Sequence, residues 1–222
     1  MARDRAIVLV SGGMDSCVTA AMAVSRFEAA FLHVSYGQRT ESRERECFDA
    51  IADHYEVKDR LVARLDHLAR IGGSSLTDPG IPVGEADLAR TDIPATYVPF
   101  RNAQFLAAAA AWGEATGARH VFIGAVEEDA TGYPDCRRSF FDCFEKTIAA
   151  GTRPGGALSI ATPVIAMTKS EIIRKGTAMG APLHLTWSCY REERVACGTC
   201  DSCALRLRGF RNAGMTDPLP YR

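Results

Sequence analysis

Short apolar runs alternate with polar, helix-like segments along most of the chain. The run at residues 7–10 is apolar and rich in β-branched side chains, which is typical of a strand buried on both faces. The sequence SGG interrupts this run at residues 11–13, and an Asp-Ser pair then stands where a helix would begin. This order predicts a strand, a tight polar turn and a helix over about residues 15–26.

The rest of the pattern predicts further elements of both kinds. Apolar runs predict strands at residues 29–34, 58–62, 121–125 and 158–161. Helical spacing and capping signals predict helices at residues 43–55, 103–116, 139–150, 168–179 and 200–212. Residues 72–94 are rich in Gly, Pro, Ser and Asp and show no convincing period. Loops of that length are uncommon in compact domains unless they are functional, so we expect a partly mobile lid over a site.

Composition and charge restrict the class of protein. A chain of 222 residues, 47% hydrophobic and 24% charged, fits one α/β domain with a small appendage, which we divide at 1–185 and 186–222. The first apolar run is too short for a signal peptide and no transmembrane run follows, so we expect a cytoplasmic protein without a membrane partner. A net charge of −1 argues against general nucleic-acid binding. Arg206, Arg208 and Arg211 are more typical of a solvated helix face than of a basic patch.

The turn at residues 11–13 has the composition of an anion site. Gly12 and Gly13 permit positive φ, so consecutive N–H groups can point inward, and a helix N-terminus adds partial positive charge. The hydroxyls of Ser11 and Ser16 can add donors. No Gly-Lys-Ser/Thr follows, so this is not a Walker A loop. The alternative is an ordinary strand-to-helix turn with polar caps.

Polar residues also follow the other predicted strands. In an open α/β sheet the ligand lies beyond the carboxyl ends of the strands, so these segments should face one crevice. The candidate substrate-binding residues are Tyr36, Gln38, Arg39, Arg101, Asn102, Tyr133, Asp135 and Arg137. Ordinary polar loops, a helix cap at Asn102 and a surface arginine at Arg101 are the alternatives.

The predicted helix at residues 168–179 begins with an unusual lysine. Thr168 and Glu171 have the spacing of a capping box. Lys169 is electrostatically unfavourable at a helix N-terminus, which suggests a nearby anion such as a phosphate. A solvated lysine is the alternative.

Four cysteines near the C-terminus have metal-ligand spacing. They follow the pattern C-x7-C-x2-C-x2-C, and the ligands are Cys189, Cys197, Cys200 and Cys203. Four thiolates suit a closed structural Zn²⁺ site, and an iron–sulfur cluster is the rival. The other four cysteines are expected to be ordinary, and so is His33 at the end of a predicted strand.

Six motifs taken together resemble the signature set of the 7-cyano-7-deazaguanine synthase (QueC) family. They are SGGMDS, HVSYGQR, TYVPFRN, TGYPDCR, MTKSEI and WSCY…CGTCDSC, and they cover nearly the whole chain in the family's order. The first is similar to the PP-loop of N-type ATP pyrophosphatases. The sequence departs from the family pattern where Thr40 replaces a usual histidine and Thr131 replaces a serine.

The resemblance implies a fold, a reaction and a set of partners. The fold would be Rossmann-like (adenine nucleotide alpha hydrolase-like), with a parallel five-stranded sheet, helices on both faces and a small zinc-binding module. The reaction would be an ATP-dependent ligation of 7-carboxy-7-deazaguanine and ammonia to the nitrile preQ0 in queuosine biosynthesis, through two adenylations that release AMP and pyrophosphate. Mg²⁺, one zinc per chain and a homodimer are also implied, with no stable nucleic-acid partner.

The same resemblance implies roles for particular residues. Ser11, Asp15, Ser16, Arg101 and Lys169 would act on the phosphates as catalytic residues. The nucleotide would be bound by Val10, Ser11, Gly12, Gly13, Met14, Asp15, Ser16, Cys17, Val18, Thr19, Ala20 and Val34. The rival functions are another PP-loop adenylating enzyme, such as a tRNA thiolase, another amidoligase or a protein-modifying relative, and a non-catalytic nucleotide- or RNA-binding module.

Overall fold

A five-stranded parallel sheet forms the centre of the computed structural model, which describes residues 3–127, 133–153 and 158–222. The strands are β1 (Arg5–Leu9), β2 (Glu28–Ser35), β3 (Arg60–Arg64), β4 (His120–Phe122) and β5 (Ser159–Ala161). Their order is β3-β2-β1-β4-β5, so the direction of winding reverses beside β1. The parallel five-stranded sheet expected from the resemblance is therefore confirmed, and the switch point lies next to the polar turn.

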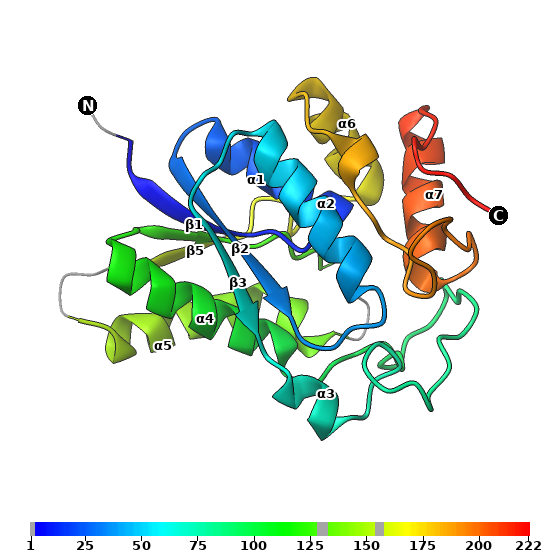
Figure 1. The fold of residues 1–222 in the computed structure, drawn as a ribbon, viewed down its shortest axis with the longest axis horizontal. Coiled ribbons are helices and arrows are strands. Elements are labelled where there is room, and N and C mark those ends of the chain that lie inside the picture. The colour runs from blue at the N-terminus through cyan, green and yellow to red at the C-terminus, as the bar shows by residue number, and fades with distance from the viewer. Residues whose placement is uncertain (1–2, 128–132, 154–157) are drawn as a thin grey trace.

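Helices cover both faces of this sheet (Figure 1). They are α1 (Met14–Val24), α2 (Glu41–His54), α3 (His67–Ile71), α4 (Arg101–Thr116), α5 (Arg138–Gly151), α6 (Lys169–Ala178) and α7 (Asp201–Ala213). Short 3-10 turns occur at η1 (Pro134–Cys136) and η2 (Leu183–Leu185). The predicted helices agree with these bounds to within a few residues, whereas α3 was not predicted because five residues are too short to show a period.

The alternation of side chains along β1 explains the two layers. Ile7 and Leu9 point to the face where α4 and α5 pack, and Val8 points to the opposite face with α1 and α2. Both sets are buried, as the uninterrupted apolar run predicted. The strand is therefore held from both sides, and the turn that follows it starts from a rigid position.

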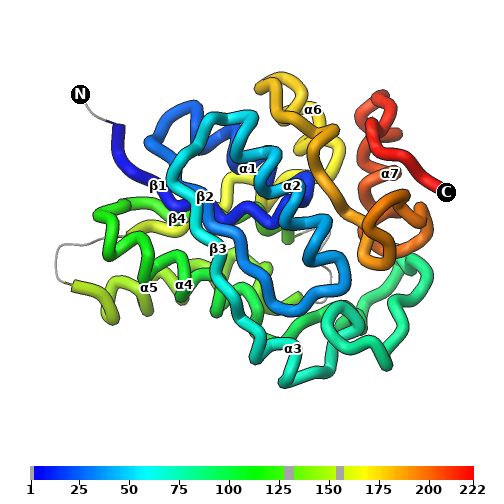
Figure 2. The backbone as a smooth tube through the Cα atoms, viewed as in Figure 1, coloured from blue at the N-terminus to red at the C-terminus, as the bar shows by residue number. Residues whose placement is uncertain are grey.

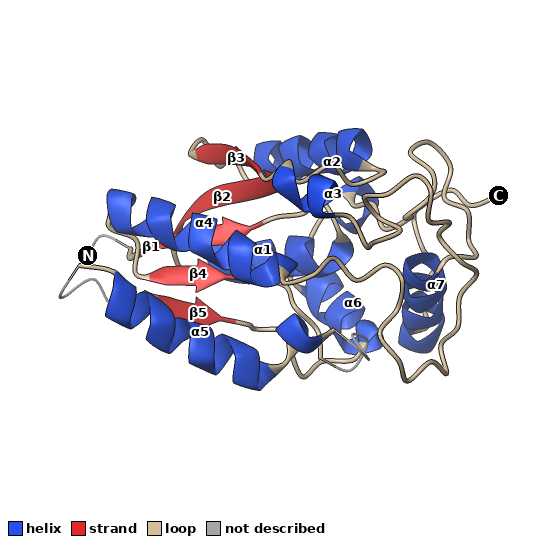
Figure 3. Cartoon of the chain, turned by 90° about the horizontal axis from the view of Figure 1, so that it is seen from below, coloured by secondary structure: helices blue, strands red, loops and turns tan. Residues whose placement is uncertain are grey.

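The C-terminal segment lies beyond the carboxyl ends of the strands, where the arrowheads point in Figure 3. Helix α7 packs on α6, and Phe210 joins Ile172, Ile173 and Val18 in one apolar cluster. The long segment from α3 to α4, residues 72–100, contains no helix or strand and runs alongside the C-terminal segment (Figure 2). Among the described residues, no helix is long and apolar enough to cross a membrane.

One predicted surface arginine is buried. Arg206 has 1% of its side chain exposed and donates to both carboxylate oxygens of Asp217, at 2.8 and 3.0 Å. It also donates to Thr186 Oγ1 at 2.7 Å. The expectation of a solvated face is wrong for this residue, because Asp217 and Thr186 return to it from outside the helix, whereas Arg208 and Arg211 are exposed.

Candidate active site

A cavity of about 390 Å³ opens at the carboxyl ends of the strands. Its walls come from the turn after β1, the segment after β2, the start of α4, residues 87–94 and the C-terminal segment. Residues 123–126 after β4, Tyr133, Cys136 and Lys169 also line it, so the predicted crevice is formed by stretches that are far apart in the chain. Part of the predicted lid, at Asp87, Leu88, Arg90 and Pro94, lines this cavity.

The turn after β1 is shaped by its own hydroxyls. Ser16 Oγ donates to the Gly13 carbonyl at 2.9 Å and accepts from the Ser11 amide at 3.2 Å. The Gly13 amide donates to Ser11 Oγ at 3.2 Å. The two hydroxyls that we expected as donors to a ligand therefore also fix the backbone of the turn.

The two glycines of this turn have different roles. Gly12 has a φ of +88°, and a Cβ placed on it would collide with the carbonyl oxygen of Glu44 in α2. Gly13 has a φ of −82° and is the N-cap of α1, so positive φ is needed only at Gly12. A side chain at Gly12 is excluded both by conformation and by space.

Asp15 and Lys169 meet across the cavity floor. Lys169 Nζ donates to Asp15 Oδ2 at 2.6 Å, and the two side chains are 14% and 26% exposed. The predicted capping box is present, because Thr168 Oγ1 accepts from the Glu171 amide and Glu171 Oε2 accepts from the Thr168 amide. Asp15 is therefore one anionic partner of Lys169, and both side chains line the cavity.

Asp15 also has the chemistry of a cation ligand. Its Oδ1 is buried without a hydrogen-bond partner among the described residues. Carboxylate oxygens are the ligands that Mg²⁺ prefers, and Mg²⁺ is commonly held by one or two of them together with phosphates. The residues present therefore fit a magnesium ion bound between Asp15 and a nucleotide.

Only the start of α1 faces the cavity. Seven of the predicted nucleotide-binding residues line it, namely Val10, Ser11, Gly13, Met14, Asp15, Ser16 and Val34. The other five, Gly12, Cys17, Val18, Thr19 and Ala20, are not among its described lining residues. The last four lie further along α1, where their side chains are buried in the protein, so they can support the turn without reaching a ligand.

Arg101 is held at the start of α4 by aromatic side chains. Its Nη1 donates to the Tyr36 hydroxyl at 2.9 Å, and its guanidinium lies over the rings of Tyr36 and Phe105. Burial raises the pKa of Tyr36 to about 12, so the phenol remains protonated. Arg101 therefore presents a fixed positive charge to the cavity, which it lines together with Tyr36.

Arg39 is engaged by the backbone of the long segment. Its Nε donates to the Ser75 carbonyl at 2.6 Å, and its Nη2 donates to the carbonyls of Asp78 and Ile81 at 2.8 and 2.9 Å. Arg39 lines the cavity as predicted, but its guanidinium already holds residues 75–81 in place.

Asp135 and Arg137 do not line the cavity among its described residues. Asp135 is 4% exposed, and its Oδ2 accepts from the Asn102 amide at 2.9 Å, at the start of α4. Asn102 Nδ2 in turn donates to the Asp135 carbonyl at 2.9 Å. The alternative that Asn102 is a helix cap is wrong, because Phe100 is the N-cap. Arg137 is exposed.

Tyr133 does line the cavity, and its hydroxyl lies 2.6 Å from Thr96 Oγ1. Thr131, where the sequence departs from the family pattern, lies in residues 128–132, which are outside the described residues. Cys136 is the only cysteine among the described lining residues, and burial raises its pKa to about 11. This thiol is therefore kept protonated, as expected for an ordinary cysteine.

Glu44 is a cavity residue that the sequence analysis did not single out. Its Oε1 accepts from Thr40 Oγ1 at 2.8 Å and its Oε2 accepts from Gln38 Nε2 at 3.1 Å. Burial raises the pKa of the Glu44 carboxyl, and the two hydrogen bonds oppose this shift. The available signal was the four-residue spacing from Thr40, the N-cap of α2, to Glu44 in the first turn of that helix.

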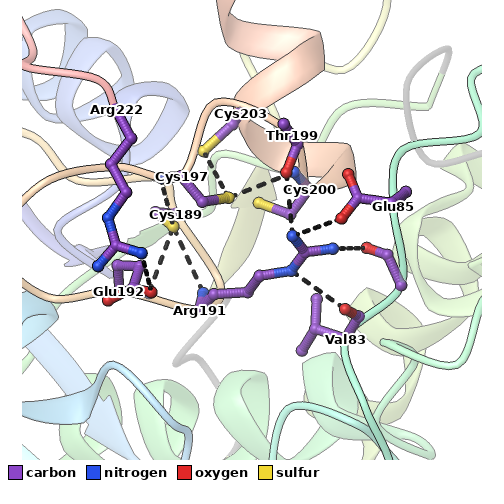
Figure 4. Close-up of polar contacts among 11 residues, drawn as sticks. Val83, Glu85, Cys189, Arg191, Glu192, Cys197, Thr199, Cys200, Cys203 and Arg222 are labelled. Carbon is purple, nitrogen blue, oxygen red and sulfur yellow. Dashed lines mark hydrogen bonds and ion pairs between the residues drawn. The ribbon is translucent and has the colours of Figure 1, made fainter.

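The four cysteines come together as predicted (Figure 4). Their Sγ atoms all lie within 4.8 Å of one another, and those of Cys197 and Cys203 are 3.9 Å apart. Zinc in a tetrahedron of thiolates separates the sulfurs by about 3.8 Å. The amides of Arg191, Glu192 and Cys197 donate to Cys189 Sγ at 3.3–3.4 Å, which favours a thiolate. The four residues therefore fit a closed metal site.

His33 is a structural residue, as expected. It is fully buried, and its Nδ1 lies 3.0 Å from the Val10 carbonyl at the end of the first apolar run. Because a carbonyl only accepts, Nδ1 carries the proton. Burial lowers the pKa of His33.

The parallel sheet, its helices on both faces and the cavity at the switch point are those of the Rossmann-like, adenine nucleotide alpha hydrolase-like fold. A solved structure of U34-tRNA thiolase NcsA from Methanococcus maripaludis, with its [4Fe-4S] cluster, matches with a TM-score of 0.52 and 11% identity. The match covers 96% of this chain and 67% of that chain. At this identity, the likeness shows the shared fold alone.

The chain belongs to the family described as "Queuosine biosynthesis protein QueC", whose model matches residues 5–214. It is 57% identical to the 7-cyano-7-deazaguanine synthase of Chlorobium phaeobacteroides (strain DSM 266 / SMG 266 / 2430), over 98% of this chain and 96% of that protein. The synthase of Chlorobaculum tepidum is also 57% identical, with the same coverage. The family and the enzyme class predicted from the motifs, a synthase that forms a C–N bond in queuosine biosynthesis, are confirmed.

Proposed function

We propose that this chain uses ATP to convert 7-carboxy-7-deazaguanine and ammonia into 7-cyano-7-deazaguanine. The observation that carries this proposal is the cavity itself. A lysine-free phosphate turn, the Asp15–Lys169 pair and the guanidinium of Arg101 all border one space, in a chain 57% identical to proteins with that name. Such a space can hold a nucleotide and an acid together.

The turn at residues 11–16 would hold the β- and γ-phosphates, which leaves the α-phosphorus open to attack by the substrate carboxylate. The bond between the α- and β-phosphates then breaks, pyrophosphate leaves, and an acyl adenylate remains. Lys169 would neutralise charge on the phosphates. Mg²⁺, held by Asp15, would supply further charge stabilisation when it is bound. No step needs a covalent protein nucleophile, which agrees with the raised pKa of Cys136.

Ammonia would displace AMP from the acyl adenylate to give the amide. The amide oxygen would then attack a second ATP, and loss of AMP and a proton would leave the nitrile. Each product therefore consumes two ATP and releases two AMP and two pyrophosphates. Arg101 would hold the acid, because a guanidinium pairs well with a carboxylate.

Glu44 would take a proton from ammonium. A cavity that receives a triphosphate and an acid is rich in negative charge, so a carboxylate within it needs a cationic partner. Ammonium is the cationic substrate, and the carboxylate of Glu44 accepts from two neutral donors, Thr40 and Gln38, with the guanidinium of Arg101 as the positive charge that acts on it within the protein. A raised pKa makes Glu44 a better proton acceptor, and the proton it accepts converts ammonium into nucleophilic ammonia.

The four cysteines would bind zinc, and the chain would form a homodimer in the cytoplasm without a nucleic-acid partner. The division at residues 185 and 186 remains a prediction. Elemental analysis with an absorbance spectrum tests the metal, because an iron–sulfur cluster would give iron and visible absorbance. Light scattering of the purified protein tests the dimer.

The decisive experiment incubates the protein with 7-carboxy-7-deazaguanine, ATP and ammonium. The expected result is the nitrile together with two AMP for each nitrile formed, and no AMP when the acid is omitted. ADP in place of AMP, or AMP without nitrile, would contradict the proposal.

A further inference from the structure

One wall of the cavity is held from outside by the four-cysteine segment, residues 189–203. That wall includes Asp87, Leu88 and Arg90, which belong to a stretch without helix or strand. A stretch without regular structure has few hydrogen bonds of its own to fix it. Its position must therefore come from its neighbours.

Arg191 makes the first part of this attachment (Figure 4). Its Nε donates to the Val83 carbonyl at 3.1 Å and its Nη2 donates to the Gly84 carbonyl at 2.6 Å. Its Nη1 donates to Glu85 Oε1 at 2.8 Å. One guanidinium thus binds three consecutive residues at the start of the wall.

Thr199 and Asp201 make the second part. The Ala86 amide donates to the Thr199 carbonyl at 2.8 Å, and the Asp87 amide donates to Asp201 Oδ1 at 2.9 Å. Arg90 Nη1 donates to Asp201 Oδ2 at 3.3 Å. The four-cysteine segment therefore makes a hydrogen bond to each of residues 83–87, and also to Arg90.

The three residues that contact the wall, Arg191, Thr199 and Asp201, each lie within two residues of a predicted metal ligand. Arg191 lies two residues after Cys189, and its amide donates to Cys189 Sγ at 3.4 Å. Thr199 and Asp201 flank Cys200. Arg191 Nη1 also donates to Thr199 Oγ1 at 3.0 Å, which ties the two sides of the segment together. The arrangement of these contacts depends on how the four cysteines are held.

We propose that Arg191 is a positioning residue that couples the four-cysteine segment to the cavity wall at residues 83–90. This attachment sets the place of the wall, and so the affinity for the small-molecule substrate, while Arg191 itself is not among the described residues that line the cavity. The identity of that substrate rests on the proposed function, whereas the coupling to the wall does not.

The test compares Arg191→Met with Arg222→Met in the metal-loaded protein. Arg222 is a matched control, because it pairs with Glu192 of the same segment at 3.0 Å. Hydrogen exchange of the amides at residues 83–90 is measured beside metal content, KM and kcat. In Arg191→Met we expect normal metal content, about tenfold faster exchange and about tenfold higher KM for the acid, because charged hydrogen bonds are lost. Turnover at saturation should change by less than about twofold, and Arg222→Met should resemble the parent.

Two further results decide the coupling. Arg191→Lys, which keeps the charge but not the fork of donors, should give intermediate exchange. Unchanged exchange at residues 83–90 in Arg191→Met, with normal metal content, would overturn the proposal. Failure of the parent protein to form the nitrile would instead contradict the proposed function, and the exchange result would still stand.

Discussion

The phosphate turn at residues 11–16 and the four-cysteine segment at residues 189–203 border the same cavity but are held in different ways. The turn lies between a buried strand and a buried helix, and its backbone packs against α2 so closely that Gly12 has no room for a methyl group. The cysteine segment has a small apolar cluster around Trp187, and many of its contacts are side-chain hydrogen bonds. The first wall depends on close packing, and the second depends on charged and polar side-chain contacts.

This difference has a consequence for catalysis. In the proposed reaction the turn would hold the phosphates in the same way for both adenylations, and close packing gives such a site little freedom to move. The cysteine segment holds another wall, at residues 83–90, through hydrogen bonds. Polar contacts there can be adjusted without disturbing the phosphate site.

The largest expected effect comes from Gly12→Ala in the turn. The added methyl requires positive φ and displaces either the turn or α2. We expect pyrophosphate release to fall by about 1000-fold or more, measured at saturating acid, because misplaced donors lose transition-state stabilisation. Gly13→Ala is the matched comparison and should lose much less activity, since Gly13 has an ordinary φ of −82°. Equal losses of activity in the two variants would show that the positive φ and the lack of space at Gly12 are not the cause.

The next effect concerns the cysteine side of the cavity. Arg206→Met leaves the buried carboxylate of Asp217 without its guanidinium, so we expect the free energy of unfolding to fall by about 3–5 kcal/mol in urea titrations. Arg211→Met, on the exposed face of the same helix, should change it by less than about 0.5 kcal/mol. A loss below 1 kcal/mol for Arg206→Met would contradict the importance of the buried pair.

A smaller effect is expected for Glu44→Gln. The rate with ammonium should fall about 100-fold, whereas formation of the acyl adenylate, measured by pyrophosphate exchange, should persist. The raised pKa means that the folded state favours the protonated carboxyl, so the ionised form at neutral pH destabilises the fold. The neutral amide should therefore raise the melting temperature by about 2–4 °C. A parallel loss of pyrophosphate exchange would place Glu44 in adenylation instead.

The smallest effect is a pH dependence at His33. Its pKa is lowered from 6.5 in the folded state, so protonation favours unfolding, and its contribution to stability is full above 6.5 and declines as the pH falls below it. His33→Gln keeps a donor for the Val10 carbonyl but does not titrate, so its melting temperature should vary less between about pH 7.5 and pH 5.5. Identical pH profiles of the two proteins would contradict this role.

Local pattern was sufficient for much of the fold and for part of the site. The run at residues 7–10, the capping box of Thr168 and Glu171, and the spacing of the four cysteines are set by neighbours in the chain. Such signals depend on backbone geometry over a few residues, so the sequence carries them directly. The six motifs then determined the family.

Other assignments depended on partners that are distant in sequence. Asp135 was predicted to bind substrate. Its carboxylate instead accepts a hydrogen bond from the backbone amide of Asn102, which lies 33 residues away in the sequence. Arg39 binds carbonyls 36 to 42 residues away, and Arg206 is buried by residues that follow and precede its helix. No local pattern in the sequence predicts contacts between residues that are so far apart in the chain.

The sequence by itself determined most of the strands and helices along the chain, the cluster of four cysteines and the family. Only the tertiary structure decided which polar side chains face the cavity and which support it. The physical reason is that a buried charge is stable only beside a partner, and the fold chooses that partner. Glu44 accepts from two neutral donors and lines the cavity. Asp135 instead accepts a hydrogen bond from the backbone at the start of α4.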